Sequence, residues 1–234
     1  MELFSFSKAG SRHRELGKPN EDYIACKEAE NGLIVSVVCD GAGSMRSGGR
    51  AAEILAPKIL DWMTVSFSTQ YFSDGETVRR RLVQLIRSTL QEYAWETGEK
   101  LSELGCTVMV AAISPDGRCL CINLGDGILL RQKQSYPDHL ADIISPPEYG
   151  LSADSTFLTT SPNLFRHIRY YRWKDSSAEK IIMLTDGAAN CILSAQDPIE
   201  RTATALCSLD TQGLREYSCK SRPIDDYSIV LLSK

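Results

Sequence analysis

The sequence has few histidines and lacks the cysteine spacing of common zinc sites. Three histidines occur in 234 residues, and all of them, His13, His139 and His167, stand isolated. A histidine-based zinc site and a serine triad therefore have little support. None of the eight cysteines forms a C-x-x-C pair, and several lie inside apolar runs. We expect reduced thiols that pack as small hydrophobic side chains.

The sequence also lacks a charge excess and a long apolar run. Its net charge is -4 and its pI is about 5.5, which does not favour a nucleic-acid surface. Lys and Arg are scattered apart from Arg79, Arg80 and Arg81, which we interpret as the solvent face of a helix. No segment approaches the roughly 20 apolar residues of a membrane span. The amino terminus lacks the basic start of a signal peptide, so we expect a cytoplasmic protein with neither nucleic acid nor membrane as partner.

The chain has no composition break that would divide it. It is 43% hydrophobic and 24% charged, with no Pro/Gly/Ser-rich linker between apolar segments. We therefore predict a single domain over residues 1–234.

Two apolar runs end in the same dipeptide. The run over 33–39 leads into Asp40-Gly41, and the run over 181–185 leads into Asp186-Gly187. Short β-branched runs are typical of buried strands, so each aspartate lies where a strand leaves the core. The glycine lets the backbone approach whatever the carboxylate holds. Because gathered carboxylates repel each other, a divalent cation with oxygen ligands is the expected partner.

Further acids fit the same centre. Glu21 and Asp22 open one strand-like run, and Asp225-Asp226 opens the last one. Asp126 follows another apolar run within Asn-Leu-Gly-Asp-Gly. The Asp116-Gly117 pair, in contrast, has the residues of a tight hairpin turn and is set aside.

Helical periodicity predicts two covering helices. Ser73 and Glu76 have the spacing of a capping box, and apolar residues follow at helical intervals up to position 101. An earlier helix is expected around 51–63, kinked or displaced at its start by Pro57. The run 107–113 is apolar on both alternating faces, as in a strand covered on both sides.

The glycine-rich segment 40–46 has a rival interpretation as a dinucleotide-binding loop, since it lies between a strand and a helix. Arg46 stands where the third glycine of that fingerprint belongs, and a Walker Gly-Lys-Ser/Thr end is absent. The carboxylate interpretation is therefore favoured over this one.

Six segments occur in the order seen in metal-dependent serine/threonine protein phosphatases of the type 2C family: 17–22, 40–44, 105–107, 123–126, 185–187 and 225–226. The chain resembles that family along nearly its whole length, and a bacterial branch in particular. The resemblance implies an α+β fold, a four-layer α/β/β/α sandwich of two central, mainly antiparallel sheets flanked by helices. It also implies a variable flap-like insert at about 134–160.

The resemblance further implies hydrolysis of a phosphomonoester by water activated at two cations, Mn²⁺ or Mg²⁺. Asp40 would bridge the cations, and Asp186 and Asp226 would complete one site, so that these three acids are the catalytic set. Asp225 could instead contact a metal ligand rather than the metal itself. The metal-binding residues implied in this way, with Asp126 at a weaker third position, are Glu21, Asp22, Asp40, Gly41, Asp186, Asp226 and Asp126.

Three positions depart from the family pattern. Gly17 stands where many members have an arginine that grips the phosphate, so Arg14 and Lys18 are the candidate phosphate-binding residues, with Arg12 as a further option. Ala42 replaces a histidine that often follows the bridging Asp-Gly. Asn190 replaces an aspartate of the third metal position.

These observations predict a phosphoprotein phosphatase whose substrates are the products of a serine/threonine kinase, acting in signalling. Two alternatives stay open at this stage. One is a sensor or scaffold that keeps the fold with little or no turnover, and the other is a hydrolase of small phosphometabolites.

Overall fold

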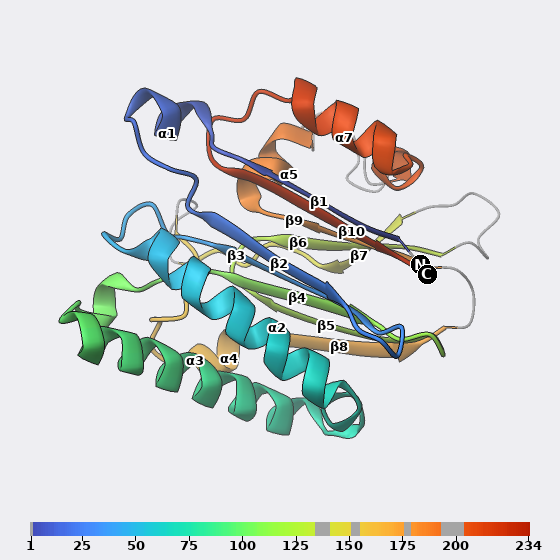
Figure 1. The fold of residues 1–234 in the computed structure, drawn as a ribbon, viewed down its shortest axis with the longest axis horizontal. Helices are drawn as coiled ribbons and strands as arrows, with labels where there is room; N and C mark the ends of the chain where they lie inside the picture. The colour runs from blue at the N-terminus through green and yellow to red at the C-terminus, as the bar shows by residue number, and fades with distance from the viewer. Residues whose placement is uncertain (1, 134–140, 151–154, 176–178, 193–203) are drawn as a thin grey trace.

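The computed structural model describes residues 2–133, 141–150, 155–175, 179–192 and 204–234. Its centre is a pair of five-stranded antiparallel sheets packed face to face (Figure 1). Sheet I has the order β1-β10-β9-β6-β7 and sheet II the order β2-β3-β4-β5-β8. The strands of sheet I are β1 (Glu2–Lys8), β10 (Tyr227–Ser233), β9 (Glu179–Leu184), β6 (Ile128–Lys133) and β7 (Ala141–Ser145). Those of sheet II are β2 (Asp22–Glu28), β3 (Ile34–Asp40), β4 (Val108–Ile113), β5 (Arg118–Leu124) and β8 (Arg169–Lys174).

Helices cover the outer face of each sheet (Figure 1). Sheet II carries the two long helices α2 (Gly48–Phe72) and α3 (Gly75–Thr97), with the short α4 (Leu164–His167) beside α3. Sheet I carries α5 (Asp186–Ile192) and α7 (Thr211–Lys220). The short α1 (Ser11–Glu15) follows β1, and a 3-10 turn, η1 (Leu101–Glu103), follows α3. The predicted α/β/β/α sandwich is therefore confirmed.

The apolar side chains form three packed layers. One lies between the sheets, and the other two lie between each sheet and its helices. Both faces of β4 are buried, as the sequence predicted. Cys119 and Cys121 lie together in the layer between the sheets, and all eight cysteines are free thiols.

The two long helices differ in detail from the prediction. The N-cap of α3 is Asp74, whose carboxylate accepts a hydrogen bond from the Thr77 backbone N–H at 2.8 Å. The predicted cap, Ser73, instead donates its hydroxyl to the Thr69 carbonyl at the end of α2. Helix α2 runs unbroken through Pro57. Its burial against sheet II outweighs the hydrogen bond that proline removes.

The predicted hairpin turn is confirmed, and the segment predicted as an insert is described only in part. The Asp116-Gly117 segment joins β4 to β5 as a tight turn, with the Gly117 N–H bonded to the Ser114 carbonyl. Residues 134–140 and 151–154 of the insert lie outside the described part of the chain. Its described remainder contributes β7 to sheet I and a single bridge between Tyr149 and Thr156. In the described residues no helix has the length and apolarity needed to cross a bilayer.

Candidate active site

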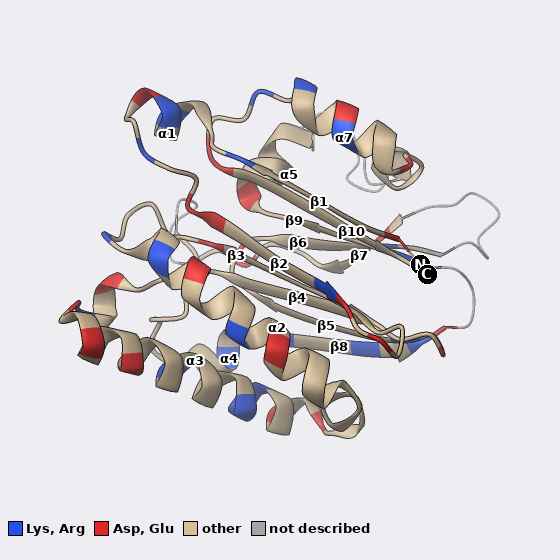
Figure 2. Cartoon of the chain, in the orientation of Figure 1, with Lys and Arg blue, Asp and Glu red and all other residues tan. Residues whose placement is uncertain are grey.

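Strand ends from both sheets place carboxylates at one end of the sandwich. Asp22 opens β2 and lies opposite Asp40, the last residue of β3, in the strand register. On sheet I, Asp186 follows β9 and opens α5, while Asp225 and Asp226 precede β10. Figure 2 shows acidic segments at the starts of β2 and α5, at the same end of the molecule. The antiparallel topology thus brings together acids that are more than 200 residues apart in the sequence.

Three of these acids, Asp40, Asp186 and Asp225, line a cavity of about 560 Å³, whereas Asp22 and Asp226 lie outside its lining. Among the residues of the predicted site, Asp40, Gly41, Asp126, Asp186 and Lys18 line it. Asp126 reaches it from the β5–β6 turn, where the chain passes from sheet II to sheet I. The remaining lining residues are Arg12, His13, Leu16, Ala42, Gly43, Ser44, Thr107, Ser155, Thr156, Leu158 and Asp225.

Burial and mutual repulsion make the carboxylates hard to ionise. Burial raises the pKa of Asp40 well above its ordinary value, and the neighbouring Asp22 and Asp186 raise it further. Burial likewise raises the pKa of Asp22 to about 7, against hydrogen bonds that favour its charged form. The pKa of Asp126 rises to about 6, chiefly through burial and then through repulsion from Asp186. A positive charge in the cavity would relieve this repulsion.

The free oxygens of the cluster fit divalent cations. Glu21 Oε2 and Asp22 Oδ1 are buried without a hydrogen-bond partner, although Asp22 Oδ2 accepts from the Thr185 hydroxyl at 3.2 Å. Buried carboxylate oxygens of this kind are the ligands that Mg²⁺ and Mn²⁺ prefer. Within the described ranges, no three His, Cys, Asp or Glu side chains form a complete ligand set by themselves. A cation here would therefore draw part of its shell from water or backbone carbonyls.

The two adjacent aspartates before β10 have different surroundings. Both oxygens of Asp226 are occupied by protein groups: Oδ1 accepts from the Gly10 N–H at 2.9 Å, and Oδ2 accepts from the Glu21 N–H at 2.5 Å and contacts His13 Nδ1 at 2.8 Å. Asp226 does not line the cavity. Asp225 does line it, and its Oδ1 is held by the Asp226 N–H at 2.9 Å. Of the pair, Asp225 has the carboxylate that faces the cavity.

Two glycines pack directly against the backbone of this pair. A Cβ on Gly10 would lie 2.3 Å from the Asp225 carbonyl carbon, and a Cβ on Gly187 would lie 2.1 Å from the Asp226 carbonyl oxygen. No side chain fits at either contact. The glycine of Asp186-Gly187 therefore lets α5 approach the start of β10 and sets Asp186 beside Asp225.

The candidate phosphate-binding residues separate into two groups. Lys18 and Arg12 line the cavity. The Arg14 guanidinium instead donates to the Ala9 carbonyl, and Arg14 is not among the cavity residues. Gly17 adopts a left-handed φ of 64° in the turn between these basic residues. The structure thus favours Arg12 over Arg14 as the partner of Lys18.

Two residues in and around the site, His13 and Arg169, were not indicated by sequence periodicity or by motifs. His13 is buried against the acids although it looked isolated in sequence. Arg169, from β8, donates to the Gly125 carbonyl at 2.5 Å and pairs with Glu148 at 3.5 Å, which ties the insert to the turn bearing Asp126. Neither residue carries a local signal, because its partners lie far along the chain.

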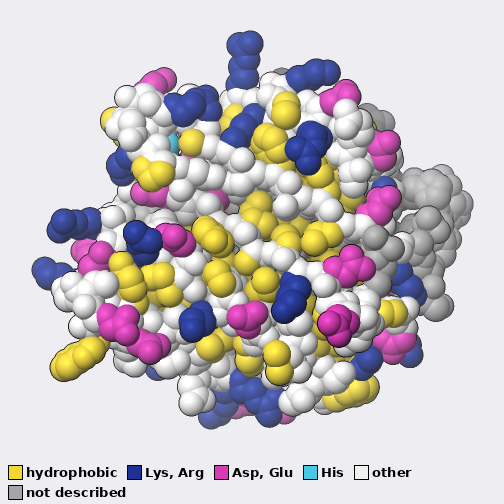
Figure 3. All heavy atoms as spheres, in the orientation of Figure 1, with side chains coloured by type: hydrophobic (Ala, Val, Ile, Leu, Met, Phe, Trp, Pro, Cys, Tyr) yellow, Lys and Arg dark blue, Asp and Glu magenta, His cyan; other side chains and the backbone are white. Residues whose placement is uncertain are grey.

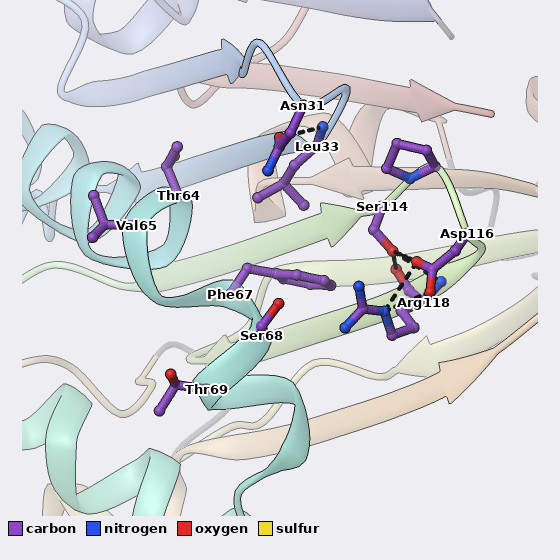
Figure 4. Close-up of a pocket in the computed structure, with 11 residues that line it drawn as sticks. Asn31, Leu33, Thr64, Val65, Phe67, Ser68, Thr69, Ser114, Asp116 and Arg118 are labelled. Carbon is purple, nitrogen blue, oxygen red and sulfur yellow. Dashed lines mark hydrogen bonds and ion pairs between the residues drawn. The ribbon is translucent and has the colours of Figure 1, made fainter.

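A second hollow, of about 460 Å³, lies at the opposite end of sheet II (Figure 4). It is bounded by the β2–β3 turn, the second half of α2 and the β4–β5 turn. Arg118, its cationic group, is held by Asp116 through two hydrogen bonds of 2.9 and 2.8 Å (Figure 4). With its charges paired locally, this hollow offers no comparable chemistry.

Known proteins resemble this chain in sequence and in fold. The curated serine/threonine-protein phosphatase 3 of Escherichia coli (strain K12) is 24% identical over 195 residues, which cover 82% of this chain and 75% of that protein. A bacterial serine phosphatase superposes with a TM-score of 0.68 at 14% identity, covering 100% of this chain and 97% of its own.

Two further solved structures have the same fold. Stp1 from Staphylococcus aureus gives a TM-score of 0.63 at 14% identity, with 99% and 94% of the two chains covered. RsbX, solved in complex with magnesium, gives 0.59 at 15% identity, with 98% and 92% covered.

The family model described as protein phosphatase 2C matches residues 9–218. The predicted family and the predicted enzyme class, a protein serine/threonine phosphatase, are thereby confirmed. A match over this much of the chain, on a fold shared with bacterial serine phosphatases, shows that the chain belongs to the protein phosphatase 2C family.

Proposed function

We propose that this protein is an active, metal-dependent phosphatase of phosphoserine and phosphothreonine in proteins. The observation that carries the proposal is a cavity lined both by buried, repelling carboxylates and by the basic Arg12 and Lys18. The carboxylates suit cations, and the basic side chains suit the phosphate dianion. We further propose that the substrates are proteins phosphorylated by a serine/threonine kinase.

Our proposed ligand set keeps all but one of the residues expected from the sequence. Glu21, Asp22, Asp40, the Gly41 carbonyl and Asp186 would hold two cations, with Asp126 at a weaker third position. Asp225 takes the role first assigned to Asp226, because the oxygens of Asp226 already accept three contacts from protein groups. Mn²⁺ or Mg²⁺ would supply a Lewis acid and an acidified water nucleophile.

The chain's own groups bind and orient the phosphate. Arg12 and Lys18 line the same cavity as the acids and can donate charge-assisted hydrogen bonds to the phosphate oxygens. Ala42, at the position of the family's frequent histidine, has no proton to give. Protonation of the departing serine oxygen therefore falls to solvent.

The retained acids also argue against the scaffold alternative. A protein that only binds partners has no need for Asp22, Asp40 and Asp186 in repulsive contact, since each could be replaced by an amide at lower electrostatic cost. Holding these acids together destabilises the folded protein, which favours a catalytic role for the cluster.

Turnover of a panel of substrates tests the proposal. We would compare phosphoserine and phosphothreonine peptides with a chromogenic aryl phosphate and with small phosphorylated metabolites, in Mn²⁺ and after chelation. The proposal predicts chelator-sensitive turnover that is fastest on the peptides. Metal binding without turnover would favour the scaffold, and preference for a metabolite would favour the small-molecule hydrolase.

A further inference from the structure

His13 lies between the Glu21-Asp22 segment and the Asp225-Asp226 segment, which together carry half of the groups proposed to hold the two cations. It is 6% exposed, at the centre of the one-turn helix α1, and lines the cavity. Its Nδ1 lies 2.8 Å from Asp226 Oδ2, and its Nε2 lies 3.6 Å from Glu21 Oε2. The ring therefore spans the gap between the Glu21-Asp22 strand start on sheet II and the Asp225-Asp226 strand start on sheet I.

Asp226 connects this contact to the cavity. Its carboxylate accepts the Gly10 and Glu21 N–H groups as well as the His13 contact, and its own N–H holds Asp225 Oδ1 at 2.9 Å. A shift of Asp226 would therefore move both the Glu21 backbone and the Asp225 side chain. Neutral imidazole has one ring N–H, and the 2.8 Å contact with Asp226 places it on Nδ1. Nε2 then carries a lone pair and makes no hydrogen bond to Glu21 Oε2 at 3.6 Å, so the ring acts on Glu21 through Asp226.

The same geometry argues against His13 as a proton donor to substrate. Both ring nitrogens face carboxylates of the protein, at 2.8 and 3.6 Å. A general acid needs a nitrogen within hydrogen-bond reach of the leaving oxygen. His13 can influence the reaction only through the acids that it contacts.

We propose that His13 is a positioning residue. By bonding Asp226, which in turn accepts the Glu21 N–H and holds the Asp225 carboxylate, it keeps Glu21 and Asp225 in register across the two sheets, so that both can serve the same metal centre. The metal part of this inference rests on the proposed function. Residues that orient metal ligands in this way typically change metal affinity by about 10- to 100-fold when they are removed.

Three substitutions separate the two contacts of the ring. His13→Asn places an amide nitrogen near the position of Nδ1 and can keep the bond to Asp226. His13→Gln places one near the position of Nε2 and can reach Glu21 instead. His13→Ala removes both contacts, and Glu15→Gln, on the same helix with an exposed side chain, is the matched control.

Calorimetric titration with Mn²⁺ should rank these variants. We expect affinity to fall by at least about 10-fold in His13→Ala, to recover most in His13→Asn, and to match the parent in Glu15→Gln. At saturating Mn²⁺ the KM for a phosphopeptide should be unchanged in all four, because both ring nitrogens of His13 are directed at protein carboxylates and not at substrate. Parent-like Mn²⁺ affinity in His13→Ala, a raised KM, or no advantage of Asn over Ala would overturn the proposal.

A measurement on the metal-free protein separates this proposal from the proposed function. The ¹⁵N chemical shifts of the three histidines report which ring nitrogen carries a proton, and His13 is assigned by its loss in His13→Gln. We expect a proton on Nδ1 in the parent and a changed His13 signal in Asp226→Ala. A bare Nδ1 would overturn the bridge even in an active enzyme, whereas a protonated Nδ1 in a protein without turnover would leave the bridge intact and the proposed function disproved.

Discussion

The two ends of the sandwich carry the same dipeptide, Asp-Gly, in opposite electrostatic settings. At one end the Ser114 hydroxyl and the Arg118 guanidinium bond Asp116 and lower its pKa to about 2. At the other end burial and neighbouring acids raise the pKa of Asp40 far above its ordinary value. The first aspartate is stabilised by residues within two positions of it. The second is destabilised by residues that only the fold brings near.

This difference indicates which end of the sandwich carries the functional site. The hairpin end satisfies its charge locally, as a turn should. The carboxylate end leaves oxygens of Glu21 and Asp22 buried and without a hydrogen-bond partner. The charges on the rest of the surface are mixed in sign on the face shown in Figure 3. Function should therefore depend on the carboxylate end and be indifferent to the hairpin end.

The largest expected effect comes from substituting Asp40, in the acid cluster at the carboxylate end. Asp40→Asn removes a charge from the middle of the acid cluster, so phosphatase activity should fall by orders of magnitude while the metal-free protein becomes no less stable. Asp116→Asn should leave activity at the parent level. Steady-state turnover in saturating Mn²⁺ and thermal melting check both. Comparable activity in the two variants would remove Asp40 from the metal centre.

Substituting the adjacent aspartates before β10 should give different defects. Asp225→Ala should weaken Mn²⁺ binding with little change in melting temperature, because its side chain faces the cavity. Asp226→Ala leaves the Gly10 and Glu21 N–H groups without their acceptor and should lower the free energy of unfolding by about 1–3 kcal/mol for each buried group. Calorimetry and chemical denaturation distinguish them. The reverse pattern would restore Asp226 as the ligand.

The phosphate grip can be tested with three alanine substitutions. Arg12→Ala and Lys18→Ala should each lower kcat/KM by a factor equivalent to about 1.5–3 kcal/mol, the range for hydrogen bonds to charged groups. Arg14→Ala should leave kcat/KM unchanged, since its guanidinium binds the Ala9 carbonyl. Mn²⁺ affinity should be the same in all three. A loss confined to Arg14→Ala would contradict the placement of these side chains.

The pH dependence of stability should have opposite signs at the two ends. Asp22 holds its proton up to a pKa of about 7 in the folded state and loses it near 3.8 when unfolded, so the metal-free protein should lose stability as pH rises from about 4 to about 7. The ion pair between Asp116 and Arg118 contributes to stability above pH 3.8, and this contribution is lost as the pH falls towards 2.

Melting temperatures across this range, with and without Mn²⁺, measure the effect. We expect Mn²⁺ to raise the melting temperature most above pH 7, where Asp22 and Asp126 are ionised. Stability that rises between pH 4 and pH 7 in the chelated protein would contradict the burial and repulsion that raise the pKa of Asp22.

The smallest expected effect concerns the third metal position. Asn190 is exposed on α5, one turn beyond Asp186. If it shares a position with Asp126, Asn190→Asp should add a tighter weak phase to a Mn²⁺ titration, and Asp126→Ala should abolish that phase. Identical isotherms for the parent and Asn190→Asp would mean that residue 190 faces no metal.

The sequence alone indicated the strands, the covering helices and a group of acids at strand ends, and its resemblance to the type 2C phosphatases implied the fold class and the family. Apolar runs that end in Asp-Gly mark strand ends, and β-branched runs with helical segments between them predict sheets covered by helices. These signals are local, because residue spacing within a strand or helix reflects its burial. The turn at Asp116 could be separated from the acids of the site for the same reason.

Only the tertiary structure decided which of those acids face the cavity and which are bonded to other protein groups. Asp225 and Asp226 are adjacent and chemically identical, and their roles separate only because Gly10, His13 and Glu21, more than 200 residues away, occupy the oxygens of one of them. Arg12 and Arg14 are distinguished in the same way by the carbonyl that Arg14 meets. A side chain's function at this site depends on partners distant in sequence, and spacing along the chain carries no record of them.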